Sequence, residues 1–242
     1  MYGCRLWCCW FQVVNDDDSI AVKPTHGPAS SQPLGLSCSS DMLIEHMVMT
    51  GVGASIGSVP PHEGHNCVRN ITFRNITMPG TTKGIYVKSN PTCGPGKSAE
   101  ITDITYESFR ILSPSWWAVW IGPQQQHEPQ SALGRKCALD YPINPHCPTQ
   151  GCVQFQNLLL KDVFIEQPTL APGVLLGNIS QPMKNVTFEN VVVKYTDGKQ
   201  HKPDPSLPLP ISNTYEVVNV EGCWRRGTDP VPSGFKPCSA GE

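Results

Sequence analysis

A short alternating segment recurs along this chain of 242 residues and restricts the possible folds more than any other feature. Five segments alternate apolar and polar residues, as half-buried strands do: Asp41–His46, Asn70–Asn75, Asp103–Ser108, Leu158–Val163 and Asn185–Asn190. The intervals are 28, 33, 55 and 27 residues when one apolar position of each copy is taken as equivalent: Leu43, Ile71, Ile104, Leu159 and Val186. The interval of 55 is close to two periods, or is one period with a long insertion.

A second short strand is expected after each of the first four copies. These strands are Ala54–Ser58, Gly84–Ser89, Ala118–Gly122 and Gly173–Gly177. A period of this size with two or three short strands per copy is typical of a parallel β-helix, whose stacked coils bury a continuous core. A β-sandwich would have a similar density of strands but not this repeated order. We therefore predict an all-β chain that forms a single-stranded parallel β-helix.

The predicted β-helix domain covers residues 1–198, because the repeat continues to that point. Within it, residues 123–151 lack the pattern and are expected to be an inserted loop. Residues 199–242 are predicted to be a proline-rich C-terminal tail, closed by Cys223 and Cys238.

The 11 cysteines indicate an oxidising compartment and several disulfides. Three of them are expected to staple the inserted loop: Cys137, Cys147 and Cys152. Four glycosylation sequons support secretion: Asn70, Asn75, Asn178 and Asn185. Asparagines at equivalent positions of neighbouring coils also suit a stacking role in the turns. We expect a secreted glycoprotein.

The first ten residues are too short and too rich in Cys and Trp for a signal peptide, so we expect the N-terminal coils to be missing from the sequence. The net charge is −2 and only 16% of residues are charged, which excludes a basic surface for nucleic acid. No apolar run approaches the roughly 18 residues that a membrane-spanning helix needs. We expect a monomer with neither a nucleic-acid nor a membrane partner.

Three adjacent carboxylates, Asp16, Asp17 and Asp18, lie between two short strands. Ionising one carboxyl beside another costs Coulomb energy, so a proton shared among them would provide an acid and a base. A solvated turn is the alternative, since Asp favours turns. A calcium loop fits less well, because its ligands alternate along the chain. In a straight strand Asp16 and Asp18 would share one side and Asp17 the other, unless the chain bends.

Four segments in order resemble the core of the polygalacturonases, glycoside hydrolase family 28, over roughly residues 11 to 122. They are Asn15–Ala21, Gly51–Ser58, Asn70–Asn75 and Lys83–Lys88. The resemblance implies a right-handed parallel β-helix that hydrolyses pectic polysaccharide of the cell wall with inversion and without a cofactor.

The resemblance also implies roles for individual residues. Asp17 matches the general acid and Asp18 a water-activating base, the pair that inverting hydrolysis requires. Lys88 matches the lysine that binds a substrate carboxylate, and Tyr86 and Asp16 are expected to lie in the same binding site.

Three features depart from the family pattern. Val52 replaces the central histidine and can neither donate nor accept a proton. Tyr86 replaces an arginine, which removes a bidentate hold on a carboxylate. The upstream Asn-Thr-Asp segment that carries a third carboxylate has no counterpart before Asp16. These departures leave three other hypotheses: an impaired paralogue that binds glycan, a polysaccharide lyase that uses calcium, and a β-helix stalk without a ligand.

Two further groups of residues allow more than one interpretation. His62, Glu63, His65 and Cys67 offer ligand types for zinc, but the loop that they form is more simply a rim of the substrate site. Trp116, Trp117 and Trp120 could form a platform for sugar rings, although burial in a core is the commoner fate of such a cluster.

Overall fold

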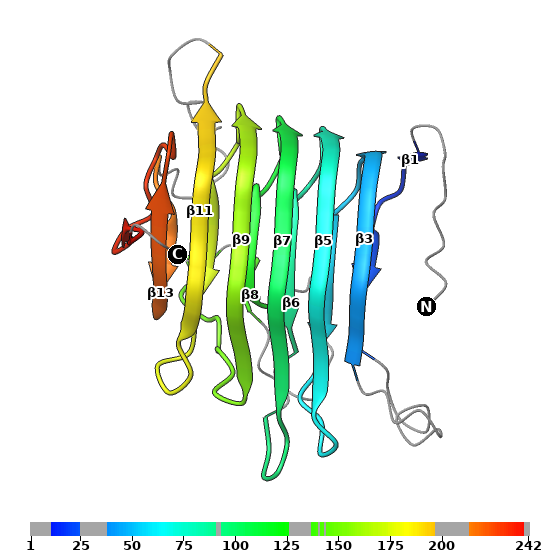
Figure 1. The fold of residues 1–242 in the computed structure, drawn as a ribbon, viewed down its shortest axis with the longest axis vertical. Coiled ribbons are helices and arrows are strands. Elements are labelled where there is room, and N and C mark those ends of the chain that lie inside the picture. The colour runs from blue at the N-terminus through cyan, green and yellow to red at the C-terminus, as the bar shows by residue number, and fades with distance from the viewer. Residues whose placement is uncertain are drawn as a thin grey trace.

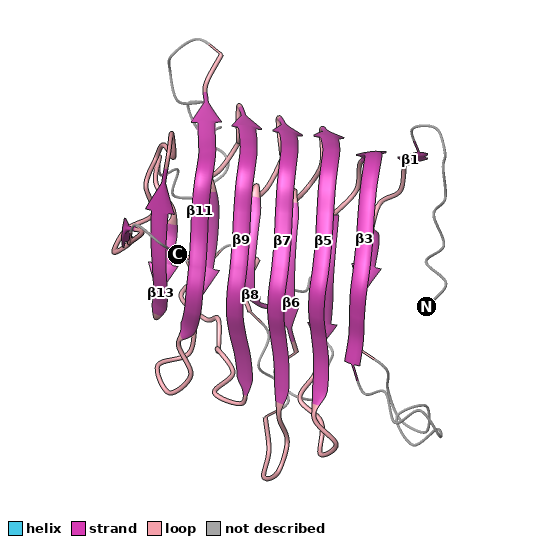
Figure 2. Cartoon of the chain, in the orientation of Figure 1, coloured by secondary structure: helices cyan, strands magenta, loops and turns pink. Residues whose placement is uncertain are grey.

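The computed structural model describes residues 11–24, 38–90, 93–125, 137–139, 141–142, 144–196 and 213–239. Within these ranges all the regular secondary structure is β-strand (Figure 2), as predicted. No helix in them is long and apolar enough to cross a membrane. The unusual start at residues 1–10, part of the expected inserted loop and residues 199–212 lie outside the described ranges.

The strands form two sheets in which all neighbouring strands are parallel (Figure 1). Sheet A contains, in spatial order, β1 (Phe11–Val13), β3 (Cys38–Met49), β5 (Asn66–Pro79), β7 (Ala99–Leu112), β9 (Val153–Glu166), β11 (Met183–Lys194), β13 (Val220–Arg225) and β14 (Lys236–Pro237). Sheet B contains β12 (Glu216–Val218), β10 (Gly173–Leu176), β8 (Val119–Pro123), β6 (Ile85–Ser89), β4 (Gly53–Val59) and β2 (Asp18–Val22). From β1 to β11 the chain alternates between the sheets, so each pair of strands is one coil. The predicted parallel β-helix is confirmed.

The long strands of sheet A turn two corners, which the sequence did not predict. The first corner has φ between 50° and 61° and is formed by Asp41, Asn70, Asp103, Asn157 and Asn185. The second has φ between 53° and 59° and is formed by His46, Asn75, Ser108, Asp162 and Asn190. Short polar side chains tolerate this left-handed conformation better than other non-glycine residues. Each predicted strand is therefore the middle section of a longer strand, between or at two corners.

The corner side chains stack from coil to coil. The amide of Asn70 donates to Asp41 Oδ1 over 2.6 Å, and that of Asn185 donates to Asn157 Oδ1 over 2.8 Å. At the second corner, Asn75 Nδ2 lies 2.7 Å from His46 Nδ1. Three of the four sequon asparagines thus occupy the stacking positions considered for them from the sequence.

The register corrects two of the positions taken as equivalent. The aligned row is Met42, Ile71, Ile104, Leu158 and Val186. Leu43 and Leu159 lie one position beyond this row, and the side chain of Leu43 is 53% exposed. Met42 and Leu43 are both apolar, as are Leu158, Leu159 and Leu160, so alternation alone could not show which residue of each run belongs to the aligned row.

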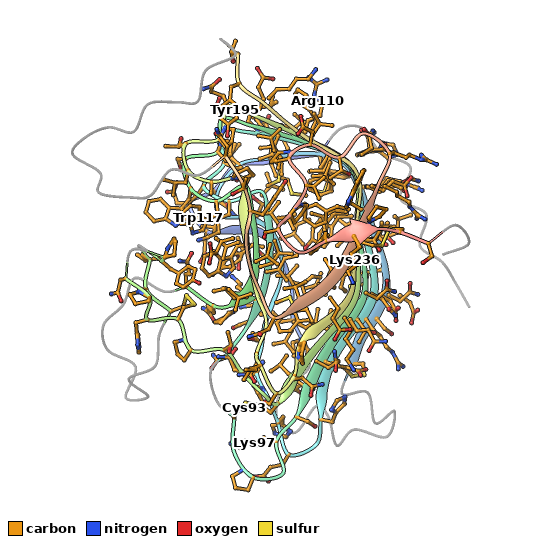
Figure 3. All side chains as sticks on the ribbon, turned by 90° about the vertical axis from the view of Figure 1, so that its left-hand side faces the viewer. Cys93, Lys97, Arg110, Trp117, Tyr195 and Lys236 are labelled. Carbon is orange, nitrogen blue, oxygen red and sulfur yellow. A yellow bond between two sulfur atoms is a disulfide. The ribbon has the colours of Figure 1, made fainter. Side chains whose placement is uncertain are left out.

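The core fills the space between the two sheets. Its inward-facing residues stack in rows, as in Phe73 of β5 and Tyr106 of β7, whose rings lie parallel with centroids 5.0 Å apart. The hydroxyl of Tyr106 donates to the carbonyl oxygen of Ala54 over 3.1 Å, which joins sheet A to sheet B through the core. Figure 3 looks along the stack and places Trp117 on the side away from Lys236 and the strands of sheet A.

β7 pairs directly with β9, so the interval of 55 residues contains one coil and a long insertion. The Cys137–Cys147 disulfide lies within this insertion, and Cys152 at its end is bonded to Cys93. The three predicted staples are therefore confirmed. A third bond of the described chain, Cys38–Cys67, joins β3 to β5.

The end of the chain differs from the tail that we expected. β12 and β13 pair with β10 and β11, so they extend both sheets by a further coil. The proline-rich stretch interrupts the repeat, so the sequence analysis did not identify the further coil that follows it. The Cys223–Cys238 disulfide closes this last part, as predicted.

Candidate active site

The three aspartates lie where the chain enters sheet B. Asp18 is the first residue of β2, the edge strand of this sheet among the described residues, and its neighbour in β4 is Gly53. Asp16 and Asp17 precede the strand in an exposed bend. The chain therefore bends at the aspartates, and strand alternation does not decide which of them share a side.

Backbone and side-chain hydrogen bonds fix this bend. Asn15 donates its amide to the carbonyl oxygen of Asp18 over 3.1 Å, and Asp18 donates its own N–H to Asp17 Oδ1 over 2.7 Å. The N–H of Val52 donates to the carbonyl oxygen of Asp17 over 2.8 Å. Gly51 has φ +81°, and a Cβ there would collide with Asn15 and with the carbonyl oxygen of Asp17. A glycine is thus required where the turn of the next coil approaches the bend.

Asp18 forms an ion pair with Lys88 across sheet B. Lys88 Nζ lies 2.6 Å from Asp18 Oδ2, and the Ser55 hydroxyl donates to Asp18 Oδ1 over 2.7 Å. The side chains of Lys88 and Asp18 are only 7% and 11% exposed. Burial lowers the pKa of Lys88, and the hydrogen bond and charge of Asp18 oppose that shift. The structure therefore unites Asp18 and Lys88, while the Asp17 carboxyl accepts a hydrogen bond from the backbone.

Tyr86 occupies the position matched to the family's arginine, and it is buried. Its hydroxyl accepts from Gln125 N over 3.0 Å and donates to the carbonyl oxygen of Gln125 over 3.2 Å. Burial raises the pKa of Tyr86, so its hydroxyl stays neutral. Lys88 Nζ lies over the Tyr86 ring at 4.2 Å from the centroid, a distance at which a ring attracts a cation.

Lys83 is a further residue of this site, and the sequence analysis gave it no role. It is 4% exposed, and its Nζ lies 4.7 Å from the centroid of the Tyr86 ring. Burial, followed by the nearby charge of Lys88, lowers the pKa of Lys83 to about 7. A lysine before a short strand is normally solvated, so no sequence signal marked it as buried.

A second apolar cluster packs Tyr86 of this site together with side chains of the later coils. Its buried members are Tyr86, Trp117, Trp120, Cys137, Leu170, Ala171, Val174 and Leu176. Val52 and Trp116 pack against it from partly buried positions. Trp117 and Trp120 are therefore packed inside this cluster and present no open platform for a sugar ring. Val52 offers an aliphatic contact where the family has a histidine.

The loop with His62 and His65 lies away from the aspartates. It follows the last residue of β4, whereas Asp18 pairs with the first. His65, Cys67 and Glu100 have potential ligand atoms within 4.8 Å of one another. Cys67 is bonded to Cys38, however, and a disulfide sulfur is not the thiolate that zinc binds. The residues therefore do not fit the zinc site considered for them, and the rim of the aspartate site is not formed by this loop.

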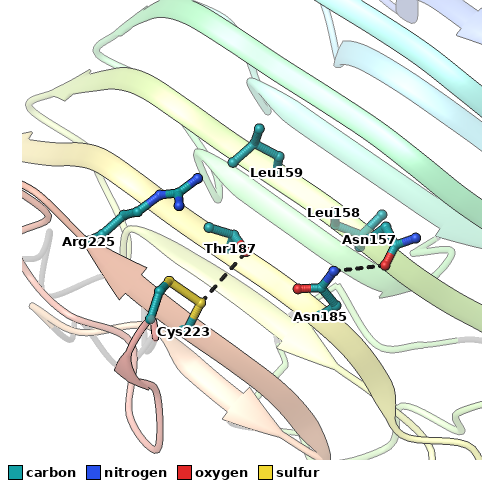
Figure 4. Close-up of a pocket in the computed structure, with 8 residues that line it drawn as sticks. Asn157, Leu158, Leu159, Asn185, Thr187, Cys223 and Arg225 are labelled. Atoms are coloured by element: carbon teal, nitrogen blue, oxygen red, sulfur yellow. Dashed lines mark hydrogen bonds between the residues drawn. A yellow bond between two sulfur atoms is a disulfide. The ribbon is translucent and has the colours of Figure 1, made fainter. Parts of the chain in front are cut away.

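A shallow pocket of about 510 Å³ lies on sheet A near the last coils (Figure 4). It is lined by residues of β9, β11 and β13 and by Cys238, with Asn157 and Asn185 at one end and Arg225 at the other. None of the aspartates or lysines of the candidate site contributes to it. The pocket is therefore separate from the residues that the sequence singled out.

Comparison with known proteins agrees with the resemblance. The family model described as "Glycosyl hydrolases family 28" matches residues 10–205. A curated relative, "Probable endopolygalacturonase D" of Neosartorya fischeri, is 27% identical over 191 residues, which cover 77% of this chain. The matched part is 32% of the relative, so the chain spans about a third of the length of that protein.

Proposed function

Because the chain belongs to glycosyl hydrolases family 28, we propose that it is a glycosidase of the polygalacturonase type. It hydrolyses glycosidic bonds in a pectic or related acidic polysaccharide. The observation that carries this proposal is the cluster of Asp17, Asp18 and Lys88 at the edge of sheet B. Carboxyl groups supply the acid and the base of glycoside hydrolysis, and a lysine suits an acidic sugar.

Asp17 is the general acid, and Asp18 is the base that activates water. Asp18 suits the base because its carboxylate is paired with the Lys88 ammonium and accepts a hydrogen bond from Ser55. Asp17 is exposed, so its carboxyl can reach a glycosidic oxygen. Inversion follows if Asp17 protonates the leaving oxygen while Asp18 deprotonates water on the opposite side of the sugar. Asp16 and Tyr86 complete the binding site.

A second candidate is an impaired paralogue that binds the same glycan without cleaving it. Two observations favour it: Val52 contributes no proton-transferring group, and Tyr86 is buried and bonded to Gln125. In this case Lys88 and its neighbours would retain the acidic chain while Asp17 and Asp18 only position it.

The disulfides of the described chain support secretion, because such bonds persist in oxidising compartments. We propose a secreted, monomeric glycoprotein that acts on cell-wall polysaccharide. Its β-helix domain includes the strands from β1 to β11 and the last coil of β12 and β13, with the insertion between β8 and β9.

The test is the release of reducing ends from polygalacturonic acid by the full chain and by the Asp17→Asn variant. Wild type should release them, and Asp17→Asn should lower the rate by at least a hundredfold because the leaving oxygen loses its proton donor. Glu221→Gln, an exposed carboxylate on β13, is the matched control and should keep the wild-type rate.

The product separates the competing functions. A hydrolase gives saturated ends, whereas a lyase gives an unsaturated sugar that absorbs in the near ultraviolet. Binding of oligogalacturonate without new ends from wild type would select the impaired paralogue. Neither binding nor cleavage on a panel of pectins and uronans would leave the stalk as the remaining explanation.

A further inference from the structure

Lys83 is only 4% exposed, and its ammonium has no hydrogen bond or ion pair to another residue in the described ranges. Its backbone is fixed, since its N–H donates to the carbonyl oxygen of Val52 over 3.1 Å and its carbonyl oxygen accepts from the Thr81 hydroxyl over 2.7 Å. The side chain reaches Tyr86, with Nζ 4.7 Å from the ring centroid. A buried ammonium that lacks a counter-ion is costly, and natural proteins pair such groups.

Positively charged groups outnumber the largely buried carboxylates around Lys83. Lys88 shares the Tyr86 ring with it, at 4.2 Å from the centroid, and is neutralised by Asp18 at 2.6 Å. Two charged groups shift the pKa of Lys83: Lys88 lowers it and Asp18 raises it. Tyr86 beside Lys83 is neutral. The charge of Asp17 also raises the pKa values of Lys88 and Tyr86, but the Asp17 side chain is exposed. Below pH 7, where Lys83 is charged, two buried cations therefore share one largely buried carboxylate.

We propose that Lys83 receives a carboxylate of the polysaccharide and so replaces the cation that Tyr86 does not supply. The substrate class rests on the proposed function, whereas the need of Lys83 for an anion rests on the structure. A uronate carboxylate has the required charge and can accept hydrogen bonds from an ammonium. Lys83 is thus a specificity-determining residue, which favours acidic over neutral or esterified sugars.

This role makes binding depend on pH. Burial and Lys88 hold the pKa of Lys83 at about 7 in the free protein. A bound carboxylate favours the charged ammonium and raises that pKa, so binding above pH 7 takes up a proton. The affinity for an acidic ligand should accordingly fall by about tenfold for each pH unit above 7 while Lys83 is neutral in the free protein.

The experiment is calorimetric titration of the full chain with trigalacturonate at pH 6 and pH 8. Wild type should bind about tenfold more tightly at pH 6 and take up protons at pH 8. Lys83→Met should weaken binding at pH 6 to the level of pH 8 and remove the pH dependence. Lys83→Arg remains charged, so its affinity should be the same at both pH values. Lys184→Met, which removes an exposed lysine on β11, should behave as wild type.

Two controls separate a binding role from a structural one. The fully methyl-esterified trimer should bind without proton uptake to every variant. Near-equal melting temperatures of wild type and Lys83→Arg show that the change in pH dependence does not arise from unfolding.

The proposal is overturned if trigalacturonate binds wild type without proton uptake, if Lys83→Met keeps the pH dependence, or if no variant binds the trimer. Binding with the expected pH dependence but without cleavage would instead contradict the proposed hydrolysis and leave the role of Lys83 intact.

Discussion

At the scale of single residues, the Asp18–Lys88 ion pair determines how the candidate site responds to substitution. Both side chains are nearly removed from solvent, and Ser55 satisfies the second oxygen of Asp18. Loss of one partner leaves an uncompensated charge, whereas loss of both removes the cost of burying either. Stability and activity should therefore respond differently to single and double changes.

We expect Lys88→Met to lower the free energy of unfolding by about 3 kcal/mol, because the Asp18 carboxylate remains in a low-dielectric position without its counter-ion. The double variant Asp18→Asn with Lys88→Met should recover part of this loss while it stays inactive. Urea unfolding measures both. Lys184→Met is the control, since an exposed lysine should change the free energy by less than about 0.5 kcal/mol. Equal stabilities for Lys88→Met and wild type would show that the pair is not buried.

The sequence identified Asp17, Asp18 and Lys88 as neighbours only through the family resemblance, since 70 residues separate Asp18 from Lys88. It did not identify the environment of Lys83. The ring beside that lysine belongs to Tyr86, which is itself buried in a cluster with side chains from residues 117–176. Local sequence patterns do not predict such packing between coils. The burial and the lowered pKa of Lys83 could therefore be found only from the structure.

At the scale of strands, the corners explain why the sequence predicted the repeat but not its full length. Alternation identified the middle section of each long strand. The corner residues are of types that are also common in turns, so they did not indicate that the strand continues. Stacking of the sequon asparagines was considered from the sequence, but the left-handed φ of the corners and the stacking of the other corner residues were not. Residue register failed where two apolar residues are adjacent, as at Leu43 and Leu159, because either could face inward.

Asn157 tests the contribution of the corners. It has φ 55°, donates to Asp103 Oδ1 over 2.8 Å and accepts from Asn185 over 2.8 Å. Asn157→Ala loses both hydrogen bonds and strains the backbone, for a total of about 3 kcal/mol. Asn157→Gly loses the hydrogen bonds but tolerates the conformation, so it should be more stable than Asn157→Ala by about 1 kcal/mol. Chemical unfolding of both variants provides the comparison. Equal losses would mean that the hydrogen bonds, and not the backbone, dominate at this corner.

At the scale of the whole molecule, each coil contacts mainly its two neighbours, so stability depends on the stacking of adjacent coils and on the links between them. The disulfides of the described chain differ in the length that they enclose. Cys93–Cys152 spans 59 residues and joins the turn after β6 to the start of β9 across the insertion. Cys223–Cys238 spans 15 residues within the last part of the stack. A longer loop loses more chain entropy when it is closed in the unfolded state.

Paired replacement of each disulfide by serine should rank the two bonds. Loop-closure entropy predicts a loss of about 4 kcal/mol for Cys93→Ser with Cys152→Ser and about 3 kcal/mol for Cys223→Ser with Cys238→Ser. The longer bond also ties the end of the insertion, at Cys152, to the turn after β6, the strand that carries Tyr86 and Lys88, so its loss should reduce binding at the candidate site as well. The shorter bond lies at the far end of the stack and should leave binding unchanged. Thermal unfolding and oligogalacturonate titration of the two variants test both statements. If the shorter bond stabilises the protein more, local packing of the last coil outweighs loop entropy, and the stack is least stable at its C-terminal end.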